Sequence, residues 1–181
     1  MSAAVSLAAV AAVFGAADAG AWIGVPGHAG SGSMGPNGQV TITFTNNLNQ
    51  QAWCNYAVYP SGQLTGLRQA ASAMNTAAWQ ENNGNPAYKA TRARGVNLVQ
   101  QAGAPVKRYA PQAYLVQAAR SKTVRWQPQR RMPGYAIFSK CVATSGSSVM
   151  NGRLTNSDFW AFPVSRGGTP FGSLNDLFPW L

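Results

Sequence analysis

The sequence contains very few acidic residues, and this shortage removes several classes of function. Four Asp and Glu residues stand against 14 Lys and Arg in 181 residues, so the formal net charge is +10. No acidic cluster could supply the group of oxygen ligands that calcium prefers. No Gly-rich loop followed by Lys and Ser or Thr is present to hold a phosphate. We therefore expect neither a calcium site nor a nucleotide-binding loop.

Histidine and cysteine are equally scarce. One His and two Cys are too few for a cysteine-only or a histidine-rich zinc site, and we expect no metal and no cofactor. His28 lies in a Gly-rich stretch where nothing in the sequence holds it, so we interpret it as a solvated linker residue. A Ser–His–acid triad is not expected, because its base must be held within hydrogen-bond reach of the nucleophile.

Low charge density combined with many apolar residues indicates a folded chain. Charged residues make up 10% of the sequence, against about 25% in average proteins, and hydrophobic residues make up 46%. This balance argues against a disordered chain. The 19 Gly and 11 Pro argue against a helical bundle, and the length suits one domain.

The N-terminal residues resemble a secretory signal peptide. Residues 3–17 are small and apolar, too short a run for a membrane span, and Ala17-Asp18-Ala19 follows them. We expect a signal peptide over residues 1–19, cleaved after Ala19 or else after Ala21, although no Lys or Arg precedes the apolar run. The alternative is an Ala-rich buried helix. Residues 20–38 are rich in Gly, Ser and Pro and predict a flexible lead-in, with the folded part beginning near Gln39.

Export would place the two cysteines in an oxidising compartment. Cys54 and Cys141 can then form the one intramolecular disulfide that two cysteines allow. The alternative is a pair of separate buried thiols. The expected localisation is extracellular or in the cell envelope.

Alternating apolar and polar residues predict several β-strands. The clearest patterns cover residues 40–45, 52–59, 122–126, 134–143 and 159–164. In the second of these, Cys54, Tyr56 and Val58 share one face. Residues 66–80 are Ala-rich and predict a helix of about three turns, which residues 81–86 stop. Residues 87–111 suggest a loop with one short strand or helix near 96–101, and residues 113–118 suit a strand or a short helix.

Two of these segments together resemble an immunoglobulin-like domain. VRWQPQRRMPGYAIFSKCV, residues 124–142, has the Val-x-Trp strand, Pro-rich turn and Gly-Tyr strand leading to a Cys, and residues 42–56 would supply the partner strand. Antibody-type domains carry Tyr where Ser139 stands, and a Trp after the first Cys rather than before it, where Trp53 stands. The resemblance implies a mainly β, Ig-like antiparallel β-sandwich over residues 39–181, with a partly helical or irregular insertion in its middle. It also implies a disulfide between facing layers.

The chain as a whole resembles small exported Ala/Gly-rich proteins of actinobacteria, many of which have no assigned activity. Fold alone carries little functional information.

The basic residues provide the main functional clue. All 14 lie between Arg68 and Arg166, and a basic surface attracts anionic polymers. We expect a non-enzymatic secreted or cell-envelope protein that binds an anionic cell-wall polymer or a membrane surface, with nucleic acid less favoured. The candidate anion-binding residues, all in loop-like or turn-like sequence, are Lys89, Arg92, Arg94, Lys107, Arg108, Arg130 and Arg131.

Two other functions stay open at this stage. A carboxylate-dependent hydrolase acting on an envelope glycan or ester could use Glu81 and Asp158, because glycoside hydrolysis usually needs two carboxylates. A capsid or filament subunit would retain the N-terminal segment, although residues 1–67 lack the basic charge that coat-protein arms often carry. The apolar tail over residues 174–181 either docks on the domain or contacts a protein partner.

Overall fold

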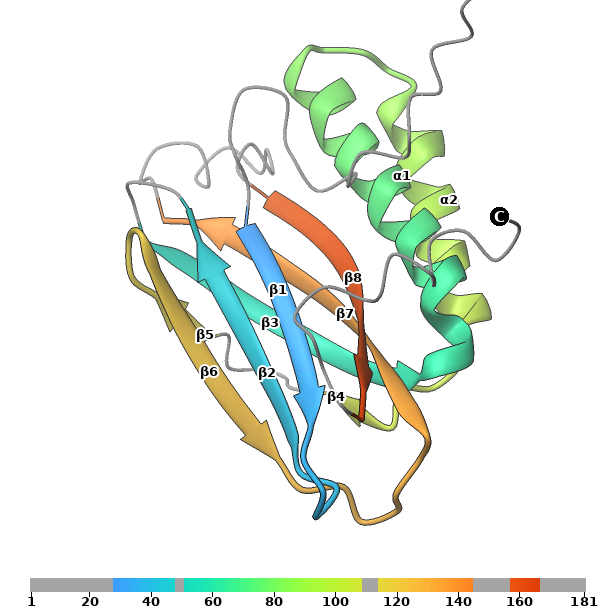
Figure 1. Ribbon diagram of the computed structural model, residues 1–181. Coiled ribbons are helices and arrows are strands. Elements are labelled where there is room, and N and C mark those ends of the chain that lie inside the picture. The colour runs from blue at the N-terminus through green and yellow to red at the C-terminus, as the bar shows by residue number, and fades with distance from the viewer. Residues whose placement is uncertain (1–27, 48–50, 109–113, 145–156, 167–181) are drawn as a thin grey trace, which may run out of the picture.

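The computed structural model describes residues 28–47, 51–108, 114–144 and 157–166, and it arranges them in three layers (Figure 1). The first layer is a three-stranded sheet in the order β1 (His28–Met34), β2 (Val40–Asn46) and β6 (Arg120–Trp126). The second is a five-stranded sheet in the order β4 (Lys107–Arg108), β3 (Ala52–Pro60), β7 (Gly134–Ala143) and β8 (Ser157–Ser165), with β5 (Tyr114–Val116) also paired to β3. The third layer contains α1 (Leu64–Asn82), entered through a 3-10 turn, η1 (Ser61–Gln63), and α2 (Tyr88–Gln101).

The expected mainly β fold, with two antiparallel sheets and a helical segment in the middle, is confirmed. All strand pairs within the two sheets are antiparallel. The predicted strands over 40–45, 52–59, 122–126, 134–143 and 159–164 all form, and the strand alternative for 113–118 is the one observed. None of the helices in the described part of the chain is long and apolar enough to cross a bilayer.

The principal core lies between the two sheets, and strand alternation explains its composition. In β2, Val40, Ile42 and Phe44 are fully buried while the Thr residues between them are half-exposed. Cys54, Tyr56 and Val58 of β3 share the opposing inner face, as their spacing predicts. Because side chains alternate between faces, the other face of β3 and β7 is free to pack on the helices. Tyr59 and Ala136 lie there against Leu67 of α1.

The folded part begins earlier than the sequence predicts, because residues 28–34 of the expected flexible lead-in form strand β1. The residues of β1 have to be small because β8 packs closely against this strand. A Cβ atom at Gly30 would overlap the side chains of Trp160 and Phe162, and one at Gly32 would overlap Val164. The Gly and Ser content that resembles a linker therefore allows close packing of β1 on β8. The predicted signal peptide, residues 20–27 and the apolar tail 174–181 lie outside the described residues.

The disulfide between Cys54 and Cys141 forms, but within one sheet. The two residues are direct partners in the register of β3 and β7, with their Cα atoms 4.0 Å apart. The expectation of a link between facing layers is therefore wrong. The physical reason is that both cysteines lie on neighbouring strands with their side chains on the same inner face, so the sulfurs meet without crossing the core.

The helical layer is longer than the sequence predicts. The helix expected over 66–80 extends over α1, and the predicted loop over 87–111 contains the 14-residue helix α2. Most residues of α2 are good helix formers, and α1 gives them a surface to pack on. A Cβ at Gly95 would lie 2.8 Å from Met74 Cγ and 3.3 Å from the Ala70 carbonyl oxygen, so the two helices approach closely at this glycine.

This close approach predicts opposite effects for two glycines in helices. Gly95→Ala should destabilise the protein by about 1–2 kcal/mol, because overpacking at the α1–α2 contact outweighs the gain in helix propensity. Gly66→Ala in α1 meets no atom within 4 Å and should stabilise by about 0.5–1 kcal/mol. Urea unfolding followed by circular dichroism measures both. A stabilising Gly95→Ala would contradict the packing.

The disulfide gives a second prediction. It joins residues 87 positions apart, and closing such a loop stabilises the folded state by about 4–5 kcal/mol in the chain-entropy model. Reduction with a phosphine should therefore lower the urea midpoint strongly, as should the double variant Cys54→Ala with Cys141→Ala. An unchanged midpoint in both samples would show that the strand pairing does not depend on the covalent link.

Candidate functional site

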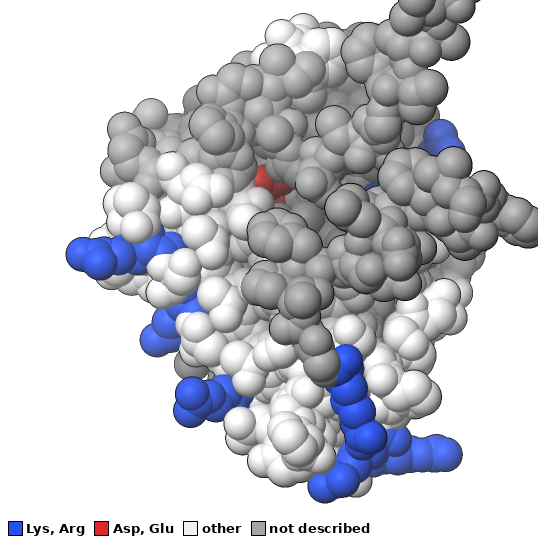
Figure 2. Space-filling view, viewed as in Figure 1, with Lys and Arg blue, Asp and Glu red and all other residues white. Residues whose placement is uncertain are grey.

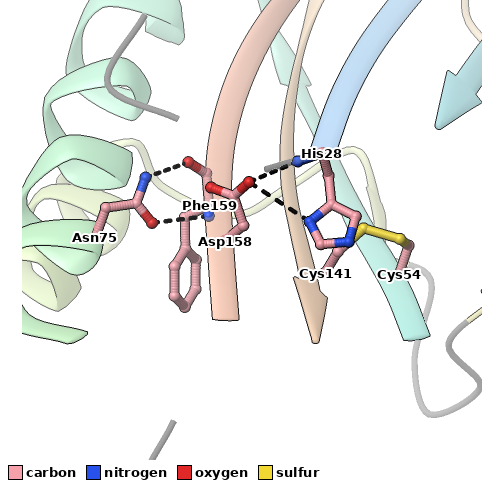
Figure 3. Close-up of polar contacts among 6 residues, drawn as sticks. All are labelled: His28, Cys54, Asn75, Cys141, Asp158 and Phe159. Atoms are coloured by element: carbon pink, nitrogen blue, oxygen red, sulfur yellow. Dashed lines mark hydrogen bonds and ion pairs between the residues drawn. A yellow bond between two sulfur atoms is a disulfide. The ribbon is translucent and has the colours of Figure 1, made fainter. Parts of the chain in front are cut away.

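The N-terminal half of β8 lies where all three layers meet, and it carries the most unusual polar contacts. The register places Asp158 opposite Cys141 and Phe159 opposite Lys140. Because neighbouring residues of a strand point to opposite faces, Asp158 lies between the two sheets and Phe159 faces the helices. Figure 3 shows the two sets of contacts on either side of β8.

Asp158 holds the first residue of β1 in place. One carboxylate oxygen, Oδ2, accepts a hydrogen bond from the backbone N–H of His28 at 2.7 Å and lies 3.5 Å from the imidazole Nδ1 (Figure 3). The imidazole is buried and stacks on Trp160, with ring centroids 5.9 Å apart and planes at 5°. The interpretation of His28 as a solvated linker residue is therefore wrong, because Asp158 and Trp160 bury it at the end of β1.

Among the described residues, no hydrogen bond joins the imidazole of this His–Asp pair to a serine, threonine or cysteine side chain. Within the described ranges, neither imidazole nitrogen makes a hydrogen bond, and Asp158 Oδ1 also has no hydrogen-bond partner there. The two cysteines are joined in the disulfide that lies close to the pair in Figure 3. Within the described residues, the pair has the geometry of a structural contact that attaches β1 to β8.

On the other side of β8, Asn75 of α1 acts as a substitute strand partner. Its side-chain Nδ2 donates to the carbonyl oxygen of Phe159 at 2.7 Å, and its Oδ1 accepts from the Phe159 backbone N–H at 2.9 Å. The amide thereby satisfies the outward-facing backbone groups of an edge strand, which are costly to bury without partners. These two bonds fix the position of α1 over β8.

A small apolar cavity lies between the helices and β8. Its volume is about 120 Å³, and its described lining residues are Met74, Ala78, Arg92, Val96 and Phe159. The lining surface is almost entirely apolar, although it includes an arginine. Arg92 Nη2 contacts Glu81 Oε2 at 2.5 Å, and the guanidinium lies 5.3 Å from the centre of the Tyr88 ring.

Lys140 lies beside this cavity. Its ammonium is 5.4 Å from the centre of the Phe159 ring, which forms part of the cavity wall. Neither described carboxylate pairs with it, because Glu81 contacts Arg92 and Asp158 contacts His28. Burial, and secondly the charge of Arg92, lowers the pKa of Lys140 below its ordinary value of 10.5. The protonated lysine is thus energetically unfavourable in this position.

The structure distributes the seven predicted anion-binding residues over three places. Lys89, Arg92 and Arg94 lie on α2, Lys107 and Arg108 form the short edge strand β4, and Arg130 and Arg131 lie in the β6–β7 connection. Neighbours in sequence between 89 and 108 are therefore parts of different elements. Lys89 and Arg94 are exposed on the helix, while Arg92 is half-buried.

Sequence reasoning missed the basic residues of β6. Arg120, Lys122 and Arg125 are all exposed on this edge strand, and with Arg130 and Arg131 they form what we call the basic margin. The signal was present in the sequence RSKTVRW, where only Val124 is buried. Polar residues on both faces of a strand indicate an edge. Lys140 was also missed, although it is a single cation inside the apolar strand YAIFSKCVA.

Glu81 and Asp158, the carboxylates of the hydrolase alternative, have separate partners. Glu81 binds Arg92 in the helical layer, whereas Asp158 binds His28 between the sheets. The five-stranded sheet lies between these two contacts. In the described part of the chain, the two carboxylates are therefore not placed to act together on one substrate bond.

The position of Lys140 predicts a pH-dependent stability. The unfolded chain keeps the lysine proton up to about pH 10.5, whereas the folded protein releases it at lower pH. Between these values the unfolded state binds more protons, so the stability of the folded state rises with pH. Lys140→Met should therefore raise the urea midpoint at pH 7, and this gain should shrink as the pH approaches 10.5.

Lys122→Met removes the same charge from exposed β6 and controls for net charge. A midpoint for Lys140→Met at or below that of the unmodified protein at pH 7 would contradict the cost assigned to this lysine.

Comparison with known proteins gives no match, whether against protein-family models, curated sequences or solved structures. The function has to be inferred from the residues and contacts of this chain.

Proposed function

We propose that this protein is a non-enzymatic, exported protein that binds a linear anionic polymer through its basic margin. Five exposed cations support the proposal: Arg120, Lys122, Arg125, Arg130 and Arg131. Figure 2 shows Lys and Arg side chains along the side of the molecule formed by β6 and at the end where the strands turn. The acidic group visible on this face lies recessed and apart from them.

The observation that carries the proposal is the lack of compensating charge in the described part of the chain. Its two carboxylates are Glu81 and Asp158, and they contact Arg92 and His28. Neither one neutralises the basic margin. Uncompensated cations along one edge raise the local concentration of anions, and several weak contacts together give measurable binding.

The backbone of the margin is held in place, so its charges have a defined spacing. At about 3.3 Å per residue, the five steps from Arg120 to Arg125 cover about 17 Å. The Tyr135 hydroxyl donates to the Arg130 carbonyl oxygen at 3.0 Å, and Gln127 donates to the Asn37 carbonyl oxygen at 3.3 Å. Arg120 and Lys122 lie on one face of β6 and Arg125 on the other, so the exposed edge of the strand presents cations over this length. Cations spread along an edge suit several charges of one chain, which favours a polymer over a single small anion.

The disulfide indicates the compartment in which the protein would bind such a polymer. Disulfides persist in oxidising compartments, so we infer that the protein acts outside the cell or in the envelope. An anionic wall polymer or an anionic membrane surface suits this location better than nucleic acid does. The immunoglobulin-like character of the sandwich belongs to the same proposal and is supported by the two antiparallel sheets alone, because the disulfide lies within one of them. The likeness to small exported actinobacterial proteins stays an expectation from the sequence.

Matched double variants locate the binding surface. Lys122→Gln with Arg125→Gln removes two charges from the margin, and Lys89→Gln with Arg94→Gln removes two exposed charges from α2. Titration with inorganic polyphosphate at several salt concentrations gives the slope of log K against log salt. The margin pair should reduce this slope by about two, because each lost phosphate contact reduces it by about one.

The α2 pair should leave the slope and the retention on a heparin column close to those of the unmodified protein. Equal losses in both pairs would show that total charge, rather than the margin, determines binding. A loss confined to the α2 pair would transfer the polymer site to the helix.

A further inference from the structure

The cavity between α1, α2 and β8 combines two features that the polymer site does not explain. It is almost entirely apolar, and two cations lie at its edge. Arg92 lines it directly, and the ammonium of Lys140 lies over the Phe159 ring that closes one side. The basic margin lies on β6 of the other sheet and in the β6–β7 connection, so this site is separate from the proposed polymer contact.

We propose that this cavity binds a small amphipathic monoanion, a carboxylate attached to one aromatic ring or a short acyl chain. The apolar part would occupy the cavity. The carboxylate would lie between the Lys140 ammonium and the guanidinium N–H groups that Arg92 does not give to Glu81.

Charge determines that the ligand is a monoanion. Lys140 and Arg92 contribute two positive charges and Glu81 one negative charge, which leaves a net charge of +1 among the described ionisable groups at the site. One carboxylate neutralises this charge completely. A dianion would leave an excess negative charge beside Glu81.

Volume determines the size of the apolar part. The cavity holds about 120 Å³, and an engineered apolar cavity of about 150 Å³ in another protein binds benzene. One ring, or an acyl chain of about four to five carbons, is therefore the largest group that the cavity accepts without rearrangement.

The energetic cost of keeping Lys140 protonated supports a ligand of this charge. Burial and the nearby Arg92 charge lower the pKa of Lys140, so the empty site keeps its proton at a cost. A bound carboxylate would favour the protonated form and raise that pKa again. Binding should therefore be accompanied by proton uptake at alkaline pH, and affinity should fall once the pH passes the lowered pKa of the free protein.

Phenylacetate is the probe that tests the proposal, with phenylacetamide as its neutral counterpart and acetate as the headgroup alone. Calorimetric titration of the intact, oxidised protein should show binding of phenylacetate at least tenfold tighter than of either counterpart. Lys140→Met should weaken phenylacetate at least tenfold. Arg94→Met removes an exposed charge from the same helix and should leave the affinity within about twofold.

A second variant keeps the test valid if Lys140→Met alters the fold. Val96 lines the cavity and is 39% exposed, so Val96→Phe can fill the space from the surface without disturbing the core. It should abolish phenylacetate binding while polyphosphate binding stays unchanged.

Equal affinity for phenylacetate and phenylacetamide would overturn the proposal. Undiminished binding in both Lys140→Met and Val96→Phe would also overturn it, as would no binding of phenylacetate at millimolar concentration. None of these results affects the proposed polymer site, whose variants lie on β6.

Discussion

The pairing of β3 with β7 is the interaction on which the other layers depend. These strands form the middle of the five-stranded sheet, and they are linked covalently where Cys54 faces Cys141. Each strand is covered on both faces, by the three-stranded sheet on one side and by the helices on the other. A shift of one residue in this register would exchange the two faces, because side chains alternate strictly. The disulfide excludes that shift and so keeps both cores in place.

The position of strand β8 depends on this register, and β8 in turn fixes where the functional residues lie. Pairing with β7 places Asp158 toward the sandwich and Phe159 toward the helices. Asp158 then fixes the start of β1, while the backbone of Phe159 fixes α1 through Asn75. The same pairing places Lys140 over the Phe159 ring. The cavity and its cations are thus consequences of how one edge strand is held from both sides.

Local pattern was sufficient for the elements whose two faces differ strongly. The alternation in β2 and β3 allowed their bounds and faces to be predicted from sequence, because one side of each strand carries large apolar residues. Strand β1 lacks this pattern. Gly30 is explained by Trp160 and Phe162, and Gly32 by Val164. These residues lie about 130 positions later in the chain and could not be connected with β1 from sequence alone. The same limit applies to His28, whose burial depends on Asp158.

The sequence predicted the chemistry of the candidate site, a basic surface for an anionic partner, but not which residues form it. A surplus of cations indicated an anionic partner, yet the spacing of residues 89–108 gave no information on which of them share a surface. The helix α2 shows why, because Arg92 points into a half-buried contact with Glu81 while Arg94 is exposed. The sequence did contain a signal for Lys140, because one lysine in an otherwise apolar strand needs either a charged partner or access to solvent at an edge. Recognising which of these applied required the position of Phe159.

The two basic features of the molecule differ in how solvent acts on them, and this difference separates their roles. The margin is exposed, so salt at physiological concentration screens its charges beyond about 8 Å, and useful affinity there requires many simultaneous contacts. Lys140 and Arg92 lie in a partly desolvated position, where screening is weaker and a single opposite charge has a larger effect. A long polyanion gains most from the first arrangement and a small monoanion from the second. One surplus of cations can therefore support two sites of different chemistry, because the fold exposes one group and half-buries the other.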